Sequence, residues 1–440
     1  MADGRRTGDP TAISLFSGAL GLDLGLEQAG FDVRVAVEAG KWQAETIRTN
    51  RPSLPVIEER IENVPTKEIL RRAGLRVGEA TIISAGPSCQ SFSTAGQRRS
   101  LDDPRGTLFR QFLRVVDEAR ARFVCMEQVK GVLSAAVRHR RLNERGPGFP
   151  PLAAEEQLGS AIRTVVEELA AINYYTVFNL INVADYGVGQ MRWRVIFMGS
   201  RDGEHLALPP PTHAEFPTDG QQPWVPLKTV LDGLDEDPDG RVAEEFSESR
   251  RKLIAQVPAG GNWTNLPAEL QREAIGKAYD SWGGRSGFLR RLSWERPAPA
   301  LTTRPASKAT MLGHPDELRP LSVAEYARIQ GFPDEWRFMG GLSNQYEMLG
   351  NAVPPPLGRA IGEQFMRLIN APKRNRWSKR GVVASASQDL LDRFSARSRT
   401  VVNPPRMRAI KGTRELRAWI QESGGGRRDP LDVEVLDEAA

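Results

Sequence analysis

Residues 80–93 read ATIISAGPSCQSFS and contain the feature to which the rest of the chain can be related. The first half is a short apolar run with β-branched residues that ends at Gly86-Pro87, a pattern typical of a buried parallel strand followed by a loop. Open α/β sheets carry reactive groups at the carboxyl ends of such strands. Cys89 therefore has the position of an exposed nucleophile, because Pro87 fixes the backbone before it and a polar loop follows. The alternative is a buried structural thiol.

The composition narrows the class of protein. A chain of 440 residues can form two or three domains with a substantial core. The formal net charge of +5 suits a polyanionic partner but discriminates weakly. The two cysteines have neither disulfide nor zinc-site spacing, so we expect a reducing, cytoplasmic compartment and no bound metal. Because no run approaches the ~18 apolar residues of a membrane span, we also expect no membrane segment.

A strand, turn and helix unit lies near the N-terminus. Residues 11–16 are a strand candidate that runs into the glycine-containing turn 17–25 and then a helical pattern. Glycines there let backbone amides approach a ligand at the helix N-terminus, which suits an adenosyl group or a phosphate. Glu38 ends the next strand about twenty residues later, where such folds place a carboxylate on ribose hydroxyls. The alternative is a turn that serves packing alone.

The strand candidate 123–126 ends at Glu127 and carries the second cysteine, Cys125. A carboxylate at one strand end beside a thiol at the neighbouring strand end supplies a nucleophile and a proton donor or acceptor. We therefore expect Glu127 to pair functionally with Cys89, and we expect Cys125 to pack in the core.

A cluster of forked donors lies between the strand candidates 174–183 and 194–199. Alternation at the start of a strand places Gln190, Arg192 and Arg194 on one face, which suits phosphates or a base edge. A solvated basic face is the alternative.

The composition changes after residue 207. From 208 to about 293 the chain is rich in Pro, Gly, Trp and Asn with poor periodicity, which predicts a loop-rich recognition module. Regular structure resumes at 321–330 and in a final helix to about residue 369. The last 70 residues open with a basic run at 373–380, which is either a solvated tail or a segment that lies along a nucleic acid backbone.

In chain order, the motifs resemble those of the bacterial DNA cytosine-5 methyltransferases over residues 12–369. The matching segments are Phe16-Ser17-Gly18 with Gly21, Gly86 to Ser93, Glu127-Gln128-Val129, Gln190 with Arg192 and Arg194, Arg319-Pro320-Leu321-Ser322 with Glu325, and Gly350-Asn351-Ala352-Val353-Pro354-Pro355. The resemblance implies a doubly wound, mostly parallel α/β sheet of the adenosylmethionine-dependent methyltransferase fold. It divides the chain into a catalytic domain, 1–207 completed by 335–370, a smaller target-recognition domain, 208–334, and a basic C-terminal extension, 371–440.

The same resemblance implies transfer of a methyl group from S-adenosylmethionine to carbon 5 of cytosine in a specific duplex DNA sequence, by base flipping and a covalent Cys89 intermediate. It implies a cytoplasmic monomer that protects host DNA from a cognate restriction endonuclease. It assigns catalysis to Cys89, Glu127, Arg192 and Arg194, cofactor binding to Phe16, Gly18, Gly21, Leu22, Glu38, Ile61, Pro87, Leu108, Asn351 and Val353, and DNA binding to Gln90, Ser93, Gly96, Arg105, Gln190, Arg290 and Arg291.

Four positions depart from the commonest family pattern. Leu20 replaces a glycine of the turn, Ser88 replaces the proline before the cysteine, and Gln128 replaces an asparagine. Arg60 stands where the family has an aspartate that binds the cofactor's adenine. Two other functions share these features, namely a tRNA cytosine-5 methyltransferase on the same scaffold and a non-catalytic DNA-binding regulator.

Overall fold

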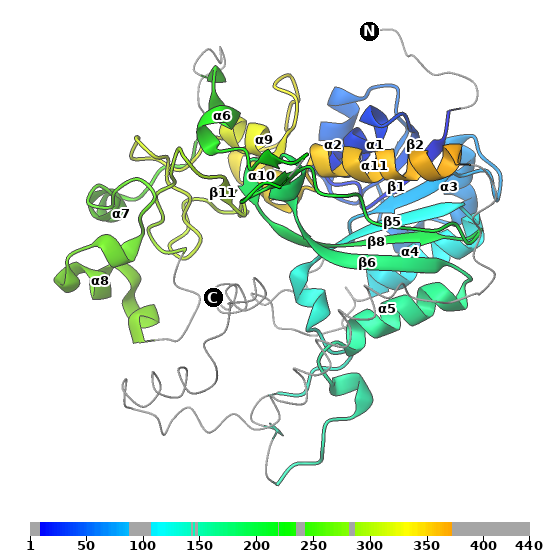
Figure 1. Ribbon diagram of the computed structural model, residues 1–440, viewed down its shortest axis with the longest axis horizontal. Helices are drawn as coiled ribbons and strands as arrows, with labels where there is room; N and C mark the ends of the chain where they lie inside the picture. Colours follow the sequence, from blue (N-terminus) through cyan, green and yellow to red (C-terminus); the bar gives the residue numbers. More distant parts are fainter. Residues whose placement is uncertain are drawn as a thin grey trace.

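One mixed sheet of seven strands forms the centre of the larger part of the molecule (Figure 1). The computed structural model describes residues 9–87, 107–141, 144–145, 148–218, 220–234, 243–280 and 287–371. The strand order is β3-β2-β1-β4-β5-β8-β6, and only β8 runs antiparallel to its neighbours in this sheet. The strands are β1 (Thr11–Leu15), β2 (Asp32–Val37), β3 (Val56–Ile57), β4 (Ile82–Ala85), β5 (Phe123–Val129), β6 (Tyr175–Asn182) and β8 (Trp193–Ser200).

Helices cover both faces of this sheet, because side chains alternate between two apolar clusters along each strand. In β1, for example, Ala12 faces one cluster and Ile13 faces the other. The first cluster is closed by α1 (Gly21–Gln28), α2 (Lys41–Asn50) and α11 (Pro355–Asn370), and the second by α3 (Thr66–Ala73), α4 (Thr107–Ala119) and α5 (Ser160–Ala171). The prediction of a doubly wound, mostly parallel sheet is confirmed.

The final helix returns to the larger part, as expected for a segment that completes the catalytic domain, and it packs against the first helix of the chain. Helices α1 and α11 approach so closely that a Cβ on Gly25 would lie 2.3 Å from the Pro355 carbonyl oxygen. A Cβ on Gly358 would likewise lie 2.4 Å from the carbonyl oxygen of Leu22. Glycine is therefore required on both sides of this contact.

The segment expected to be loop-rich contains short helices and a core of its own. The helices are α6 (Leu227–Leu231), α7 (Glu248–Ile254) and α8 (Ala268–Ile275), and small strand pairs involve β9 (His213–Ala214), β10 (Gln222–Pro223) and β11 (Ala298–Pro299). Phe246, Trp263, Phe288 and Met311 belong to an apolar cluster that is separate from those of the sheet. The segment thus has the long connections that were predicted, but it packs as a small globular unit.

This unit joins the larger one through several elements. Strand β11 pairs in parallel with β7 (Gln190–Met191), which precedes β8. Two helices then lead back to the sheet, α9 (Val323–Gln330) and α10 (Leu342–Asn351). The sequence predicted α9 but not α10. In the described part of the chain, no helix is both long and apolar enough to cross a membrane.

Candidate functional site

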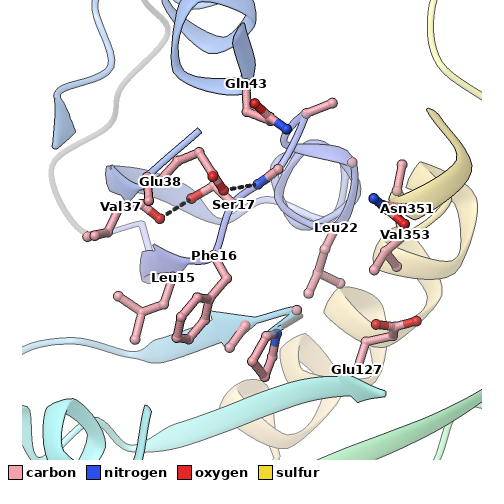
Figure 2. A pocket seen from close by; sticks show the side chains of 18 of the residues that line it. Leu15, Phe16, Ser17, Leu22, Val37, Glu38, Gln43, Glu127, Asn351 and Val353 are labelled. Carbon is pink, nitrogen blue, oxygen red and sulfur yellow. Dashed lines mark hydrogen bonds between the residues drawn. The ribbon is translucent and has the colours of Figure 1, made fainter. Parts of the chain in front are cut away.

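A cavity of about 460 Å³ lies at the carboxyl ends of β1, β2, β4 and β5 (Figure 2). Its walls come from the turn after β1, the end of β2, the start of α4, and the turn between α10 and α11. All ten residues expected at the cofactor line it, namely Phe16, Gly18, Gly21, Leu22, Glu38, Ile61, Pro87, Leu108, Asn351 and Val353. Segments far apart in sequence therefore converge on one site.

The turn between β1 and α1 has an unusual backbone. Phe16, Gly18 and Leu20 all have positive φ angles, of 53°, 54° and 68°. For Leu20 this left-handed conformation costs about 1–2 kcal/mol, which explains why the family commonly has glycine there. The leucine side chain is fully buried, and its packing offsets this cost. Gly21 follows, and a Cβ there would lie only 2.2 Å from the Val353 carbonyl oxygen.

Glu38 closes the turn from the other side. Its two carboxylate oxygens accept hydrogen bonds from the backbone N–H groups of Gly18 and Gly40, each at 2.8 Å. Burial raises the pKa of Glu38 above its ordinary value, and these backbone hydrogen bonds oppose the shift. A carboxylate can accept about four hydrogen bonds, so Glu38 keeps acceptor capacity beyond its backbone partners. Glu38 therefore lies against the glycine turn at the cavity, as the spacing predicts, and its role toward a ribose stays a prediction.

A second carboxylate, Asp23, lies below this turn and was missed by sequence reasoning. It accepts hydrogen bonds from Ser14 at 2.5 Å and from Ser84, and so connects β1, β4 and α1. The side chain is 2% exposed, and this burial raises the pKa of Asp23 to about 6. A signal was present in the sequence, since an acid between Leu22 and Leu24 in an apolar helix needs an internal partner.

The cavity wall at Ile61 contains Arg60, which stands where the family commonly has an aspartate. Ile61 and Leu108 supply its apolar surface, and Arg114 of α4 donates to the Ile61 carbonyl oxygen at 2.9 Å. The side chain of Arg60 is 69% exposed and pairs with Glu62 at 3.1 Å. Arg60 therefore replaces the family's hydrogen-bond acceptor, an aspartate, with a cation. This cation is paired with Glu62, whose carboxylate lines the cavity.

Glu127 and Arg194, two of the residues expected to be catalytic, lie together at one side of the cavity, here called the catalytic edge. Strand β4 ends at Ala85, which pairs with Met126, so Glu127 projects just past the end of β4 although it lies inside β5. Arg194 is its diagonal neighbour on the antiparallel strand β8, and the Arg194 Nε lies 2.6 Å from the Glu127 Oε1. Both side chains are nearly buried and line the cavity.

Glu127 also lies next to the segment that leads to Cys89. A Cβ on Gly86 would be 4.0 Å from the Glu127 Oε2. The amide of Gln128, which replaces the common asparagine, donates to the Pro87 carbonyl oxygen at 2.9 Å. The sequence thus predicted correctly that β4 and β5 are neighbours. Cys125 is fully buried, and this burial raises its pKa far above the ordinary thiol value, so Cys125 is the core residue that was expected.

Gln190 and Arg192 are placed differently from what was expected. Gln190 has no exposed surface, and its amide bonds to Gln330 at 2.7 Å and to the N–H of Leu301 at 3.2 Å. A surface contact between Gln190 and DNA does not fit this placement. Arg192 lines the cavity, but its guanidinium donates to the carbonyl oxygens of Leu301 and Gly350, at 3.1 and 2.6 Å. Alternation predicts the direction of these side chains but not their partners.

In the small unit, Arg291 also bonds inward. Its guanidinium donates to the carbonyl oxygens of Val257 and Asp316, at 3.1 and 2.8 Å, while the residue stays partly exposed, so its contact with DNA stays a prediction. Arg290 is half-buried beside it. Here too, the donors of Arg291 support the backbone of the unit.

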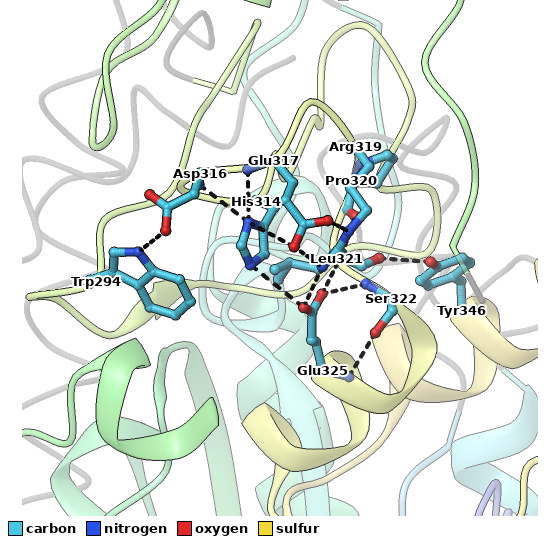
Figure 3. Close-up of polar contacts among 10 residues, drawn as sticks. All are labelled: Trp294, His314, Asp316, Glu317, Arg319, Pro320, Leu321, Ser322, Glu325 and Tyr346. Carbon is cyan, nitrogen blue, oxygen red and sulfur yellow. Dashed lines mark hydrogen bonds and ion pairs between the residues drawn. The ribbon is translucent and has the colours of Figure 1, made fainter. Parts of the chain in front are cut away.

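The motif Arg319-Pro320-Leu321-Ser322 with Glu325 forms a polar network (Figure 3). Arg319 forms a forked pair with Glu325, with both distances 2.8 Å. Burial would raise the pKa of Glu325, but Arg319 lowers it below its ordinary value. Glu325 and Ser322 also form a capping box, in which each side chain bonds to the other's backbone N–H. The network therefore fixes the start of α9, the helix that ends at Gln330.

Several expected site residues lie outside the described part of the chain. They are Cys89, Gln90, Ser93, Gly96 and Arg105, together with the basic run at 373–380. Sequence reasoning also missed three residues that the cavity or its supports use, namely Gln43, Glu347 and Gln330. Each of these is a single polar residue in a helix, and such a residue does not stand out in the sequence from the polar residues of a solvent-exposed helix face.

The comparisons with known proteins match this geometry. The model of the C-5 cytosine-specific DNA methylases matches residues 11–367. The chain belongs to this family. It is an enzyme that uses S-adenosylmethionine as methyl donor and DNA as substrate, so neither the tRNA methyltransferase nor the non-catalytic regulator is favoured.

Individual relatives cover most of this methylase. The type II methyltransferase M.Sau96I of Staphylococcus aureus is 35% identical over 369 residues, which are 83% of this chain and 78% of that protein. The type II methyltransferase M.Eco47II of Escherichia coli is 32% identical over 368 residues, which are 82% and 79%.

Solved structures show the same fold at lower identity. A prophage-encoded protein of E. coli superposes with a TM-score of 0.55 at 24% identity, over 82% of this chain and 99% of the other. The methyltransferase EhMeth of Entamoeba histolytica gives a TM-score of 0.52 at 14% identity, over 83% of this chain and 100% of the other.

Proposed function

We propose that this methylase modifies one particular sequence in duplex DNA, with Cys89 as the nucleophile and Glu127 as the acid. The observation that supports these roles is the Glu127–Arg194 pair, which lies at the edge of the cofactor cavity and beside Gly86. Gly86 is three residues before Cys89 in the sequence. On this proposal Arg194 orients the carboxyl group of Glu127, and a methyl donor bound in the cavity would lie within reach of the same edge.

The residues account for the chemistry in the following way. Carbon 5 of cytosine is a weak nucleophile, so the Cys89 thiolate adds to carbon 6 while Glu127 gives a proton to nitrogen 3, which moves electrons onto carbon 5. S-adenosylmethionine supplies the electrophilic methyl group that carbon 5 takes up. Loss of the carbon 5 proton to a base, cleavage of the sulfur–carbon 6 bond and return of the nitrogen 3 proton to Glu127 then restore the ring, free Cys89 and regenerate the acid. The base must leave the helix first, because carbon 6 is covered in the stack.

The same proposal gives three parts of the chain separate tasks. Residues 1–207, completed by 335–370, hold the cofactor and the reacting groups, while 208–334 read the DNA sequence and 371–440 add contacts to the DNA backbone. The separate core of the small unit supports this division. The similar proteins are named type II methyltransferases, which supports protection of host DNA against a restriction endonuclease. On this proposal the protein acts as a monomer in the bacterial cytoplasm, where that DNA lies.

The test is covalent trapping on fluorinated DNA. Bisulfite sequencing of DNA from cells that express the protein first gives the methylated site. With 5-fluorocytosine at that site, addition and methyl transfer proceed, but fluorine cannot leave as a proton, so a denaturation-resistant complex accumulates. We expect it to require S-adenosylmethionine, to disappear in Cys89→Ala and to persist in Cys125→Ala. An adduct that survives the loss of Cys89 would overturn the assignment.

A further inference from the structure

The peptide groups of Leu301 are held from both sides by side chains of the catalytic part. The N–H of Leu301 donates to the Gln190 Oε1 at 3.2 Å, and its carbonyl oxygen accepts from the Arg192 Nη1 at 3.1 Å. All three residues are buried. Leu301 follows β11 and packs in the apolar cluster of the larger part, before the chain enters the small unit's core again at Ala306 and Met311. Gln190 and Arg192 therefore hold the segment that connects β11 to the small unit.

The same two side chains also reach the turn that lines the cofactor cavity. Arg192 donates through its other nitrogen to the Gly350 carbonyl oxygen at 2.6 Å. The Gln190 amide donates to the Gln330 Oε1 at 2.7 Å, and Gln330 in turn donates to the Leu349 carbonyl oxygen. Asn351 and Val353, which follow directly, form part of the cavity wall. Two parallel bridges thus connect Leu301 to the cofactor turn.

The two backbones that these bridges connect are in direct contact. A Cβ on Gly350 would lie 2.8 Å from the carbonyl carbon of Thr302 and 2.9 Å from its oxygen. Strand β11 is tied to β7 on the other side, since the N–H of Ala298 donates to the Gly189 carbonyl oxygen at 2.9 Å. A close-packed interior of this kind transmits displacement rather than absorbing it.

Helix α9 anchors the far end of the bridges. The helix begins at the Ser322–Glu325 capping box, which the forked Arg319 pair holds, and it ends at Gln330 (Figure 3). Gln330 has no exposed surface. Its position is therefore set by the Arg319–Glu325 network at the start of α9, while its hydrogen bonds reach the cofactor turn.

We propose that Gln190, Arg192 and Gln330 form a junction that couples DNA binding to cofactor binding. DNA fixes the recognition unit and thereby Leu301, and the junction carries that position to residues 349–353. By thermodynamic linkage, a bound cofactor orders the same turn and favours DNA by the same factor. The three side chains are positioning residues in this role. The inference rests on the proposed reading of DNA by residues 208–334.

The experiment measures the affinity for S-adenosylhomocysteine by calorimetry, with and without a duplex that carries the methylated site found by bisulfite sequencing. Wild-type protein is expected to bind about fivefold or more tightly with the duplex present, within the usual range of coupling factors. In Gln330→Met, which keeps the length of the side chain but removes its amide, the ratio falls about twofold or more, because one of the two bridges is lost while the Arg192 bridge remains. The matched control is Gln345→Met, because Gln345 of α10 also donates to two carbonyl oxygens, those of Phe338 and Gly340, but lies outside the junction.

The outcomes separate the junction from the function itself. An unchanged ratio in a folded Gln330→Met protein, or no coupling in wild-type protein, overturns the junction even if the DNA is still methylated. Hydrogen–deuterium exchange of wild-type protein gives a second measurement that needs no variant. DNA alone should slow exchange at residues 349–353, and unchanged exchange there would contradict the proposal. Absence of methylation by wild-type protein would instead contradict the proposed function.

Discussion

The catalytic edge and the junction contain two arginines that are two residues apart and line the same cavity, yet only one of them is paired with the proposed catalytic acid. Arg194 forms an ion pair with the Glu127 carboxylate and also donates to the Trp193 carbonyl oxygen at 2.8 Å, whereas Arg192 donates to two carbonyl oxygens that belong to different parts of the chain. A guanidinium on a carboxylate orients that group, and one on carbonyls fixes backbone positions. On the two proposals above, one motif therefore supplies both a chemical and a mechanical function.

The largest effect is expected at the catalytic edge. Glu127→Gln keeps the size of the side chain but cannot donate a carboxyl proton in the same way, so methyl transfer in single-turnover assays should fall about a hundred- to ten-thousand-fold. Affinity for S-adenosylhomocysteine should change little, because the glycine turn and Glu38 are untouched. Near-normal methyl transfer by Glu127→Gln protein would show that Glu127 is not the catalytic acid.

Lysine substitutions at the two arginines separate their functions directly. Arg194→Lys leaves a cation near Glu127 but loses the planar fork, so we expect roughly tenfold slower transfer with little change in stability. Arg192→Lys leaves at least one buried carbonyl oxygen unpaired, which should lower the free energy of unfolding by about 2 kcal/mol. Single-turnover rates and urea unfolding of both variants give the comparison. Identical profiles for the two variants would show that the distinction between the two regions is wrong.

A methyl group at the glycine turn tests whether the cavity needs the contact with Val353. Gly21→Ala would place a Cβ 2.2 Å from the Val353 carbonyl oxygen, so the two walls must separate. We expect about tenfold weaker binding of S-adenosylhomocysteine, an effect of about 1.4 kcal/mol. Gly25→Ala is the control, because it meets the Pro355 carbonyl oxygen at 2.3 Å and does not line the cavity. It should reduce stability with a smaller loss of affinity, and equal losses would argue against a local effect.

The smallest effect is expected at Asp23. Because burial raises the pKa of Asp23 to about 6 from an ordinary 3.8, the folded state holds the proton more tightly than the unfolded state. This contribution to stability therefore declines as pH rises through the window between these values and is unfavourable above it. Relative to Asp23→Asn, wild-type protein should lose about 1 kcal/mol of unfolding free energy between about pH 5.5 and 7.5. Urea unfolding at both pH values measures it, and a pH-independent difference would contradict the shift.

The fold and the cofactor cavity could be predicted from the sequence because they depend on local patterns. Apolar runs give the strands, and the spacing from Gly18 to Glu38 matches the hydrogen bond that joins them. The partners of Gln190 and Arg291 could not be predicted, since a surface contact and a buried hydrogen bond to a carbonyl require the same donor. Helix α10 was missed because its polar face and its glycine hide the period of an amphipathic helix.

The contact between α1 and α11 has a consequence for synthesis of the chain. Gly25 meets Pro355 and Gly358, which a ribosome adds more than 300 residues later, at roughly 5–20 residues per second. During that interval the apolar face of the first helix has no native cover, and contacts this distant in sequence form slowly. The nascent protein thus spends tens of seconds with an exposed apolar surface near its N-terminus. A chaperone that binds apolar segments would find its target there, and release would follow arrival of the last helix.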